Sequence, residues 1–198
     1  MTAAGDVPVQ RRNKSFGETH QAMIETAVRL IAESGAEALT IAALARAMSL
    51  NRTTVYYHFD SREALLDAVK IWSSEQLAMA FLPLAPVKER IDYISRFVLE
   101  NPELIKLWIE QFVSAGDIRA SYPQWDALVA GTSAILAAAY PDEAVDGEVY
   151  CVMLLAAAII GPRVFKNSVR PEASIESIVE RFIAEQLRML KRDGLLPT

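Results

Sequence analysis

The chain has 198 residues, of which 52% are hydrophobic and 23% are charged, and its formal net charge is −5. This composition supplies enough apolar material for a packed core and excludes a disordered chain. The net negative charge argues against a protein that coats nucleic acid nonspecifically, since such binding needs many lysines and arginines.

The cysteine content and the start of the sequence indicate the cellular location. The single cysteine, Cys151, cannot form an internal disulfide, and no secretory leader opens the sequence, so we expect a cytoplasmic protein. The longest uncharged apolar run, Val149 to Gly161, is shorter than the roughly 20 residues of a membrane-spanning helix. We therefore expect no membrane partner.

Residues 1–18 are predicted to form a flexible basic arm. The first ten residues lack periodicity and contain both glycine and proline, and three basic residues follow, namely Arg11, Arg12 and Lys14. A solvated tail explains this cluster as well as a DNA contact does. Between residues 10 and 62, seven basic residues stand against five acidic ones, so this part is slightly positive while the rest is acidic.

Three helices are predicted within residues 19–62. Apolar residues three or four apart indicate a helix over 19–34, and two shorter helices follow over about 41–48 and 51–57. A much longer helix then begins at Arg62. Residues with capping side chains or a flexible backbone mark the ends of these helices: Gly35, Thr40, Asn51 and Ser61.

Beyond residue 62 the chain is predicted to be helical, without a strand pattern of useful length. Prolines separate the helices, because the residue before proline disfavours the helical conformation and proline suits the first helical turn. The proline of Gly161–Pro162 should bend or break its helix. The expected segments are 62–81, 87–100, 102–115, 122–140, 142–166 and 171–193. The fold class is therefore all-α, with a small domain over 19–62 and a larger one over 63–198.

Two short helices joined by a tight turn, after a longer helix, have the geometry of a helix-turn-helix, whose second short helix enters the major groove of DNA. Geometry alone is weak, because many helical proteins contain such a corner. The side chains decide the matter. The second short helix has one aliphatic anchor, Val55, whereas its other residues can hydrogen-bond to phosphates or base edges: Asn51, Arg52, Thr53, Thr54, Tyr56 and Tyr57.

Residues 39–69 resemble the DNA-binding signature of the TetR family of bacterial regulators. Matching positions, in the family's order and spacing, are Thr40, Ile41, Ala45, Leu50, Thr54, Tyr56, His58, Phe59, Arg62, Leu65 and Leu66. The remaining helices agree with the family only in number, length and order. The chain departs from the family at Ser49, where glycine is usual in the turn, and at Ala42 and Ala43, where many relatives are polar or basic.

The resemblance implies that the partner is double-stranded operator DNA. Thr40 would hold a phosphate at a helix N-terminus, while Arg52 and Thr53 would face bases. The backbone or thymine methyls would be contacted by Thr54 and Tyr56. The phosphates of the opposite strand would be met by Tyr57 and His58.

Arg62 is assigned on the same basis, and the two histidines carry structural expectations. Arg62, where the family commonly has lysine, would bind a phosphate at the start of the long helix. For His58 the alternative is a half-buried ring that satisfies a backbone carbonyl. His20, at the start of the first helix, is expected to lie at the surface.

A homodimer is implied, because a symmetric pair would place two recognition helices about 34 to 36 Å apart on a palindromic site. The last two helices are the candidates for the interface. Residues 142–166 are apolar nearly all round, and residues 174–190 carry apolar side chains at helical spacing. Small residues at 156–158 and Gly161 would let a partner helix approach closely. Packing within one chain is the alternative and must hold for part of each helix.

Bulky residues of the larger domain can line an apolar cavity for a small molecule, although core packing alone explains most of them. The candidates are Trp72, Met79, Trp108, Phe112, Trp125, Tyr150 and Met153. Few charges interrupt these stretches, which favours a neutral or weakly polar, hydrophobic effector. In the family such an effector lowers operator affinity, and the long helix from Arg62 would carry the motion.

The sequence thus predicts a ligand-responsive, DNA-binding transcriptional repressor. One alternative is a small helical enzyme or carrier that binds a hydrophobic metabolite without DNA. Another is an interaction protein in which the helix-turn-helix is vestigial. The sequence contains no catalytic set of residues, and its two histidines and one cysteine are not clustered, so we expect no enzyme activity, no metal and no cofactor.

Overall fold

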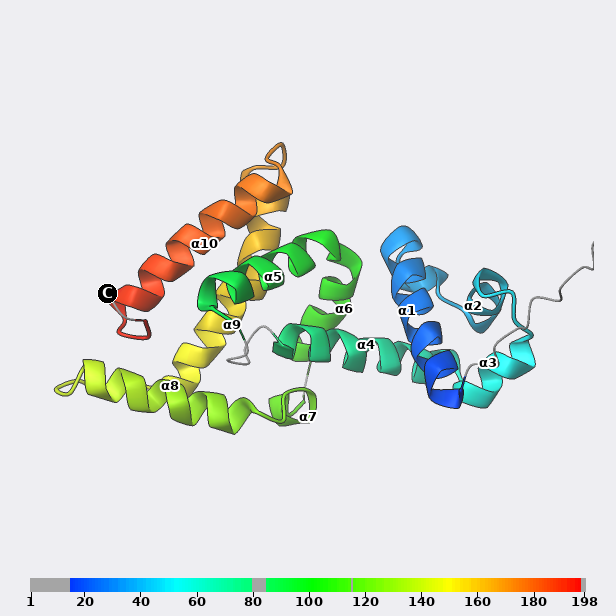
Figure 1. The fold of residues 1–198 in the computed structure, drawn as a ribbon, viewed down its shortest axis with the longest axis horizontal. Helices are drawn as coiled ribbons and strands as arrows, with labels where there is room; N and C mark the ends of the chain where they lie inside the picture. The colour runs from blue at the N-terminus through cyan, green and yellow to red at the C-terminus, as the bar shows by residue number, and fades with distance from the viewer. Residues whose placement is uncertain (1–14, 80–84, 115, 197–198) are drawn as a thin grey trace, which may run out of the picture.

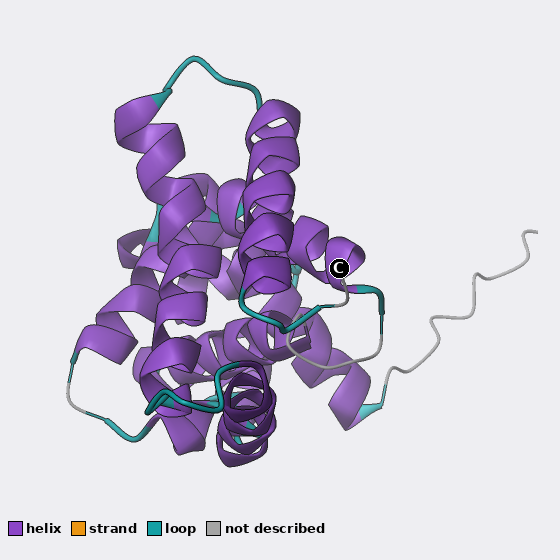
Figure 2. Cartoon of the chain, turned by 90° about the vertical axis from the view of Figure 1, so that its left-hand side faces the viewer, coloured by secondary structure: helices purple, strands orange, loops and turns teal. Residues whose placement is uncertain are grey.

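The computed structural model describes residues 15–79, 85–114 and 116–196, and every regular element in these ranges is a helix (Figure 2). The elements are α1 (Phe16–Ser34), the 3-10 turn η1 (Ala36–Ala38), α2 (Ile41–Ala47), α3 (Arg52–His58), α4 (Arg62–Met79), α5 (Val87–Glu100), α6 (Pro102–Val113), α7 (Ile118–Ser121), α8 (Trp125–Ala139), α9 (Gly147–Val164), the π-turn η2 (Phe165–Val169) and α10 (Ile175–Arg192). The all-α prediction is confirmed.

The molecule is elongated, with a small head at one end and a larger body at the other (Figure 1). The head consists of α1, α2 and α3, and the body of α5 to α10. Helix α4 runs from the head into the body, and α6 also contacts α1. The basic residues of the N-terminal arm, Arg11, Arg12 and Lys14, lie outside the described residues.

Helix α1 begins at Phe16, three residues before the predicted start at residue 19. The reason is a capping box: the Glu18 backbone N–H donates to Ser15 Oγ at 3.3 Å, and the Ser15 N–H donates to Glu18 Oε2 at 2.8 Å. The predicted arm is therefore too long by residues 15–18. The extra turn brings Phe16 and His20 beside α3, which matters for the candidate site.

The head has its own core, because α1, α2, α3 and α4 each supply side chains that water cannot reach. Ile31, Leu44, Val55 and Leu65 are completely buried in one cluster. Leu104 of α6 belongs to the same cluster. The head is thus packed against the body through α4 and α6.

The body is organised around α9, which packs against α5 and α8, while α10 packs mainly against α5. Helices α8 and α9 approach very closely at Gly147, since an added Cβ there would overlap the side chain of Ser133. Gly161 plays a similar part toward α10, because its Cβ would lie 3.0 Å from the ring of Phe182. The small residue at 161 therefore serves packing within the chain.

Three helix boundaries in the body differ from the sequence predictions. The helix predicted over 122–140 begins only at Trp125, as α8, and the short helix α7, which ends at Ser121 before Pro123, was not predicted. Helix α9 begins at Gly147 rather than 142, because the Asp146 carboxylate accepts the N–H groups of Glu148 and Val149. The last helix begins at Ile175 rather than 171.

Pro162 does not break α9. It removes only one backbone donor, and the helix continues to Val164 before it changes into the π-turn η2. The whole stretch Gly147–Val169 is long and apolar enough to cross a membrane by length and composition, and 28% of its most apolar window is buried. It also carries Glu148, Arg163 and Lys166.

Candidate nucleic-acid interface and effector cavity

Helices α2 and α3 each begin at a capping side chain. Thr40 Oγ1 accepts the Ala43 N–H at 3.0 Å, and Asn51 Oδ1 accepts the Thr53 N–H at 3.0 Å. Ser49 in the turn has a φ of 54°, the left-handed conformation that glycine usually supplies. This conformation costs free energy at a residue that carries a Cβ, so Ser49 is a strained position in the turn.

Helix α3 is held to the head by one side chain and presents the others to solvent. Val55 is fully buried against α2, whereas Arg52, Thr53, Tyr56 and Tyr57 are exposed and Thr54 is half-buried. Tyr57 is 76% exposed. The face predicted to contact DNA is therefore open, and its exposed members project from one short helix.

Arg62, predicted to bind a phosphate, makes contacts within the head that the sequence did not indicate. Its Nε donates to the Leu39 carbonyl at 2.7 Å and its Nη2 donates to the Ala36 carbonyl at 2.8 Å. Glu37 lies 3.9 Å from the same guanidinium. Arg62 therefore ties the start of α4 to the η1 segment that precedes Thr40.

An aromatic cluster joins the start of α1 to the end of α3. The Phe16 ring stacks on His58 with centroids 4.2 Å apart and meets Tyr57 edge-on at 5.5 Å. His20 stacks on Phe59 at 4.6 Å and lies 5.6 Å from His58. His20 is thus half-buried in a ring cluster, so its expected place at the surface is wrong.

The His58 ring does not satisfy a backbone carbonyl through Nδ1, because this buried atom has no hydrogen-bond partner among the described residues. Burial lowers the pKa of His58, and the neighbouring His20 lowers it further. The ring is therefore neutral at pH 7. Sequence analysis missed Phe16 as a neighbour of the recognition helix, although the S-x-x-E pattern of residues 15–18 was a readable sign of the earlier helix start.

The described head carries no excess of positive charge. Residues 15–62 contain four arginines and five acidic residues, which gives a formal charge of −1. The positive balance counted from residue 10 onward therefore comes entirely from the arm. An electrostatic contribution of the head to DNA binding has to come from local arginines such as Arg46 and Arg52, both of which are exposed.

A cavity of about 640 Å³ opens in the body between α6, α7 and α9. Three of the predicted ligand residues line it, Trp108, Phe112 and Trp125, and the rings of Trp108 and Phe112 stack at 4.1 Å. Its remaining apolar wall is aliphatic and comes from α6, α7 and α9: Ile109, Val113, Ile118, Val152, Leu155, Ala156 and Ile160. The volume falls within the range of drug-sized ligand pockets, about 300 to 1,000 Å³.

The other predicted ligand residues lie elsewhere. Trp72 packs near Phe97 beside the head core, and Met153 is 62% exposed on the outer side of α9. The Tyr150 hydroxyl donates to Asp193 Oδ2 at 2.6 Å, beyond α10. The side chain of Met79 lies outside the described part of the structure. Trp72 and Tyr150 thus make contacts within the chain, as in the core-packing alternative, and Met153 lies on the outer surface.

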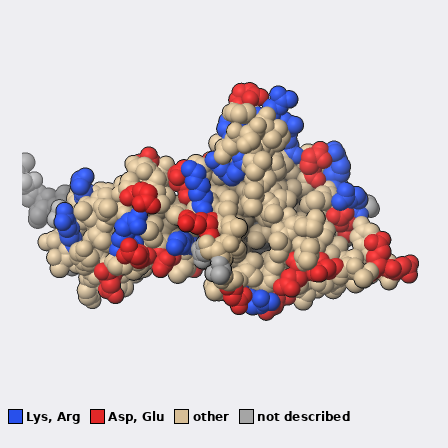
Figure 3. Space-filling model, turned by 180° about the vertical axis from the view of Figure 1, so that it is seen from behind, with Lys and Arg blue, Asp and Glu red and all other residues tan. Residues whose placement is uncertain are grey.

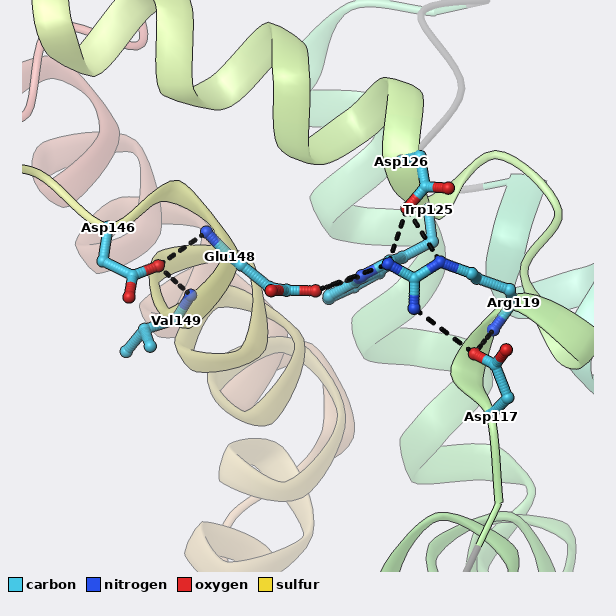
Figure 4. Close-up of polar contacts among 7 residues, drawn as sticks. All are labelled: Asp117, Arg119, Trp125, Asp126, Asp146, Glu148 and Val149. Atoms are coloured by element: carbon cyan, nitrogen blue, oxygen red, sulfur yellow. Dashed lines mark hydrogen bonds and ion pairs between the residues drawn. The ribbon is translucent and has the colours of Figure 1, made fainter.

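One side of the cavity rim is charged, which the sequence analysis did not anticipate (Figure 4). Arg119 of α7 pairs with Asp126 at 2.8 Å and Asp117 at 3.4 Å, and it lies 3.7 Å from Glu148. The Trp125 Nε1–H also donates to Glu148 Oε1 at 3.3 Å. The N–H of Arg119 lowers the pKa of Asp117, so this carboxyl is ionised at neutral pH. A four-residue helix gives too little periodicity to be recognised in the sequence.

The exposed side of α9 carries large apolar residues. Val149, Val152, Met153, Ile160 and Val164 are each at least 39% exposed. In the view of Figure 3 the middle of the body is a broad area without charged side chains. On α10, by contrast, Ile178, Val179 and Ile183 are buried within the chain, and the exposed positions are largely charged.

Within the described ranges, no group of three or more histidine, cysteine or acidic side chains is arranged to hold a metal ion.

Comparison with known proteins matches the N-terminal part of the chain to a family model and most of the chain to a known fold. The family model for bacterial regulatory proteins of the tetR family matches residues 23–69, which span α2, α3 and parts of α1 and α4. No curated protein matches the chain in sequence.

Several solved structures share the fold over most of the chain. A protein of unknown function from Rhodococcus sp. RHA1 is 18% identical, with a TM-score of 0.65 over 90% of this chain and 97% of its own. A TetR/AcrR-family transcriptional regulator from Thermobifida fusca is 20% identical, with a TM-score of 0.57 over 85% and 96%. AibR in complex with isovaleryl coenzyme A and operator DNA is 21% identical, with a TM-score of 0.54 over 85% and 97%.

Proposed function

We propose that this chain, whose residues 23–69 match the family model for bacterial regulatory proteins of the tetR family, is a cytoplasmic repressor that binds one operator sequence and releases it when a small effector enters the body. The observation that carries the proposal is the open face of α3, whose polar side chains surround a single buried anchor, Val55. In this proposal the chain acts as a ligand-responsive, DNA-binding regulator and has no enzyme activity.

Helix α3 is the recognition helix and lies in the major groove. Arg52 and Thr53, at its N-terminal end, meet base edges, and Tyr56 and Thr54 meet the backbone or thymine methyls. The Thr40 hydroxyl, whose oxygen already accepts the Ala43 N–H, still has its hydrogen to donate to a phosphate.

The other assigned positions act at the edges of this contact. Asn51 acts first as the cap of α3, because its side-chain oxygen is taken by the Thr53 N–H. Tyr57 and His58 lie at the other end of the helix, toward phosphates of the opposite strand, and Phe16 supports both rings. Arg62 is a positioning residue, because its guanidinium ties the segment before Thr40 to α4.

A homodimer formed through the last two helices presents two heads to a palindromic operator. Helix α9 supports this arrangement, since an exposed apolar stripe through Val149, Met153 and Val164 is costly to leave in water. Helix α10 contacts α9, and its largely charged exposed side fits the polar rim of such an interface. The small residue Gly161 contributes to contact within the chain, as described above.

The cavity is the effector site, and two helices connect it to the head. Helix α4 contributes Leu65 and Val69 to the head core and Leu77 to the cluster that contains Trp108 and Trp125. Helix α6 contributes Leu104 to the head core and Trp108 to the cavity wall. A ligand that displaces the cavity wall therefore changes the position of the heads, with a coupling of about 1 to 3 kcal/mol being typical of such systems.

AibR supports the pairing of the two sites in one fold, since its structure holds both a ligand and operator DNA. For this chain the test is an unbiased selection of bound sequences from random DNA with the purified protein, followed by titration of the selected site at several salt concentrations. We expect a palindromic sequence and an affinity that falls with salt. Absence of any sequence preference would contradict the proposal and favour a metabolite-binding protein or enzyme without DNA function.

The specific role of α3 is tested by Arg52→Ala with Arg29→Ala as a matched control, since Arg29 is an exposed arginine on α1 away from α3. Loss of discrimination between the selected site and a site altered at one base is expected for Arg52→Ala only, at about 1 to 3 kcal/mol. Equal loss for both variants would contradict the assignment of α3 as the recognition helix.

A further inference from the structure

The charged rim of the body cavity combines with its aromatic wall to define the chemistry of the ligand. The walls are apolar and include the rings of Trp108, Phe112 and Trp125. The charged residues among the lining are Asp117, Arg119 and Glu148, which sum to −1. Asp126, which pairs directly with Arg119, brings the cluster to −2.

Arg119 is occupied by two of the three carboxylates. Its Nη2 lies 2.8 Å from Asp126, its Nε donates to the same carboxylate at 2.9 Å, and Asp117 lies 3.4 Å from its Nη1. Glu148 is the loosest partner, 3.7 Å from Nη2. A cation that drew Glu148 away from Arg119 would leave both other pairs in place (Figure 4).

Glu148 is also fixed where a ligand can reach it. It stands in the first turn of α9, whose start is capped by Asp146, and it accepts the Trp125 Nε1–H at 3.3 Å. Its side chain is 58% exposed, and it belongs to the lining of the cavity. The carboxylate therefore faces both the solvent and the aromatic wall formed in part by Trp125.

We propose that the cavity takes an organic cation, namely an apolar body that fills the space between α6 and α9 and carries an ammonium group that pairs with Glu148. This inference rests on the proposed function in taking the cavity as the effector site. It replaces the neutral or weakly polar, hydrophobic effector expected from the sequence with a positively charged one.

An anionic ligand fits this cavity poorly. A carboxylate or phosphate near the rim would meet a local charge of −2 and would compete with Asp126 and Asp117 for Arg119. An ammonium group, in contrast, is attracted to the carboxylates and to the faces of the tryptophan rings, which favour cations within about 6 Å. The same argument sets this chain apart from AibR, whose structure holds isovaleryl coenzyme A.

The test compares three probes with the same ten-carbon chain and different head groups: decyltrimethylammonium, decan-1-ol and decanoate. Binding to the full chain without DNA is measured by isothermal titration calorimetry and by the fluorescence of the cavity tryptophans. We expect the ammonium probe to bind at least ten times more tightly than decanoate, with decan-1-ol between them. Failure of the ammonium probe to bind, or equal or tighter binding of decanoate, would overturn the proposal.

Two substitutions change the rim charge in opposite directions. Glu148→Gln should weaken the ammonium probe about five-fold, the upper effect of one partly exposed ion pair, and should leave decan-1-ol unchanged. Arg119→Gln should strengthen the ammonium probe, since it frees carboxylates for the ligand. Glu180→Gln, an exposed acid on α10 outside the cavity lining, is the matched control and should change nothing.

A purely structural effect of these substitutions would weaken all three probes together. Weakening of the ammonium probe by Arg119→Gln, or no change with Glu148→Gln, would overturn the role given to the rim. The proposed function is tested separately by DNA selection without any ligand. A protein that selects an operator but binds decanoate best would keep the function and lose only this inference.

Discussion

Arg62 allows the phosphate contact expected from the sequence to be separated from the structural role seen in the head. Its guanidinium donates to the carbonyls of Leu39 and Ala36, and its side chain is only 30% exposed. Hydrogen bonds from a charged donor are each worth about 1.5 to 3 kcal/mol when buried, and partial exposure reduces that value. We therefore expect Arg62→Ala to lower the free energy of unfolding by about 2 kcal/mol.

The assay is urea denaturation monitored by circular dichroism, together with operator titration as a function of salt. A positioning role predicts lower stability and weaker operator binding, with an unchanged slope of log affinity against log salt. A phosphate contact predicts unchanged stability and a slope that is smaller by about 0.9. The latter result would refute the assignment of Arg62 as a positioning residue.

Two further variants sharpen this test. Arg62→Lys keeps the charge but cannot present two donors in the fork that reaches both carbonyls, so most of the stability loss should remain. Arg46→Ala removes an exposed arginine from the last turn of α2 and should leave the free energy of unfolding within about 0.5 kcal/mol of the parent. Full rescue by lysine would point to charge alone.

Three other predictions follow from particular contacts. Tyr150→Phe removes the 2.6 Å hydrogen bond to the buried Asp193 and should cost about 1 to 2 kcal/mol of unfolding free energy without affecting decyltrimethylammonium affinity, as measured by denaturation and calorimetry; a selective loss of probe binding would contradict this. Deletion of residues 1–14 removes three basic residues and one acidic residue, and should weaken operator binding and reduce the salt slope by up to about 2.7; an unchanged slope would make the arm a solvated tail. The pKa of His58 is lowered below 6.5 in the folded state, so the unfolded state binds more protons at this group and its contribution to stability should be constant above pH 7 and fall as the pH drops below 6.5. His58→Gln should reduce this pH dependence in a series of denaturation curves, and identical pH dependence of both proteins would contradict the prediction.

The parts of the fold that the sequence could predict are those with local signals. The capping side chains of Thr40 and Asn51 mark the starts of α2 and α3 within a few residues. The left-handed backbone of Ser49 was likewise readable from its place in the turn. Each of these features depends on neighbours in the chain, so the sequence contains the necessary information.

Features that depend on residues far apart in the chain were not predictable. Arg62 reaches carbonyls 23 and 26 residues away, and this role cannot be distinguished from a phosphate contact by residue type alone. The rim of the cavity is assembled from α7, α8 and α9, and its charge becomes visible only when Arg119 and Glu148 are placed together. Tyr150 is a bulky residue of the kind that lines pockets, but its hydroxyl binds Asp193 at the end of α10.

The head core and the core beside the cavity meet on α6, which limits how an effector can act. Leu104 is buried in the head core, and Ile105 and Trp108 are buried in the core that forms the cavity wall. Leu104 and Trp108 are one helical turn apart, about 6 Å along the axis, and a helix transmits displacement over that distance with little bending. A ligand that moves Trp108 must therefore either move Leu104 within the head core or lose packing at one of the two sites. Because Leu104 is 1% exposed and closely packed, the head is expected to move with α6 as a unit, so that ligand occupancy alters the position of α3 without altering its internal structure.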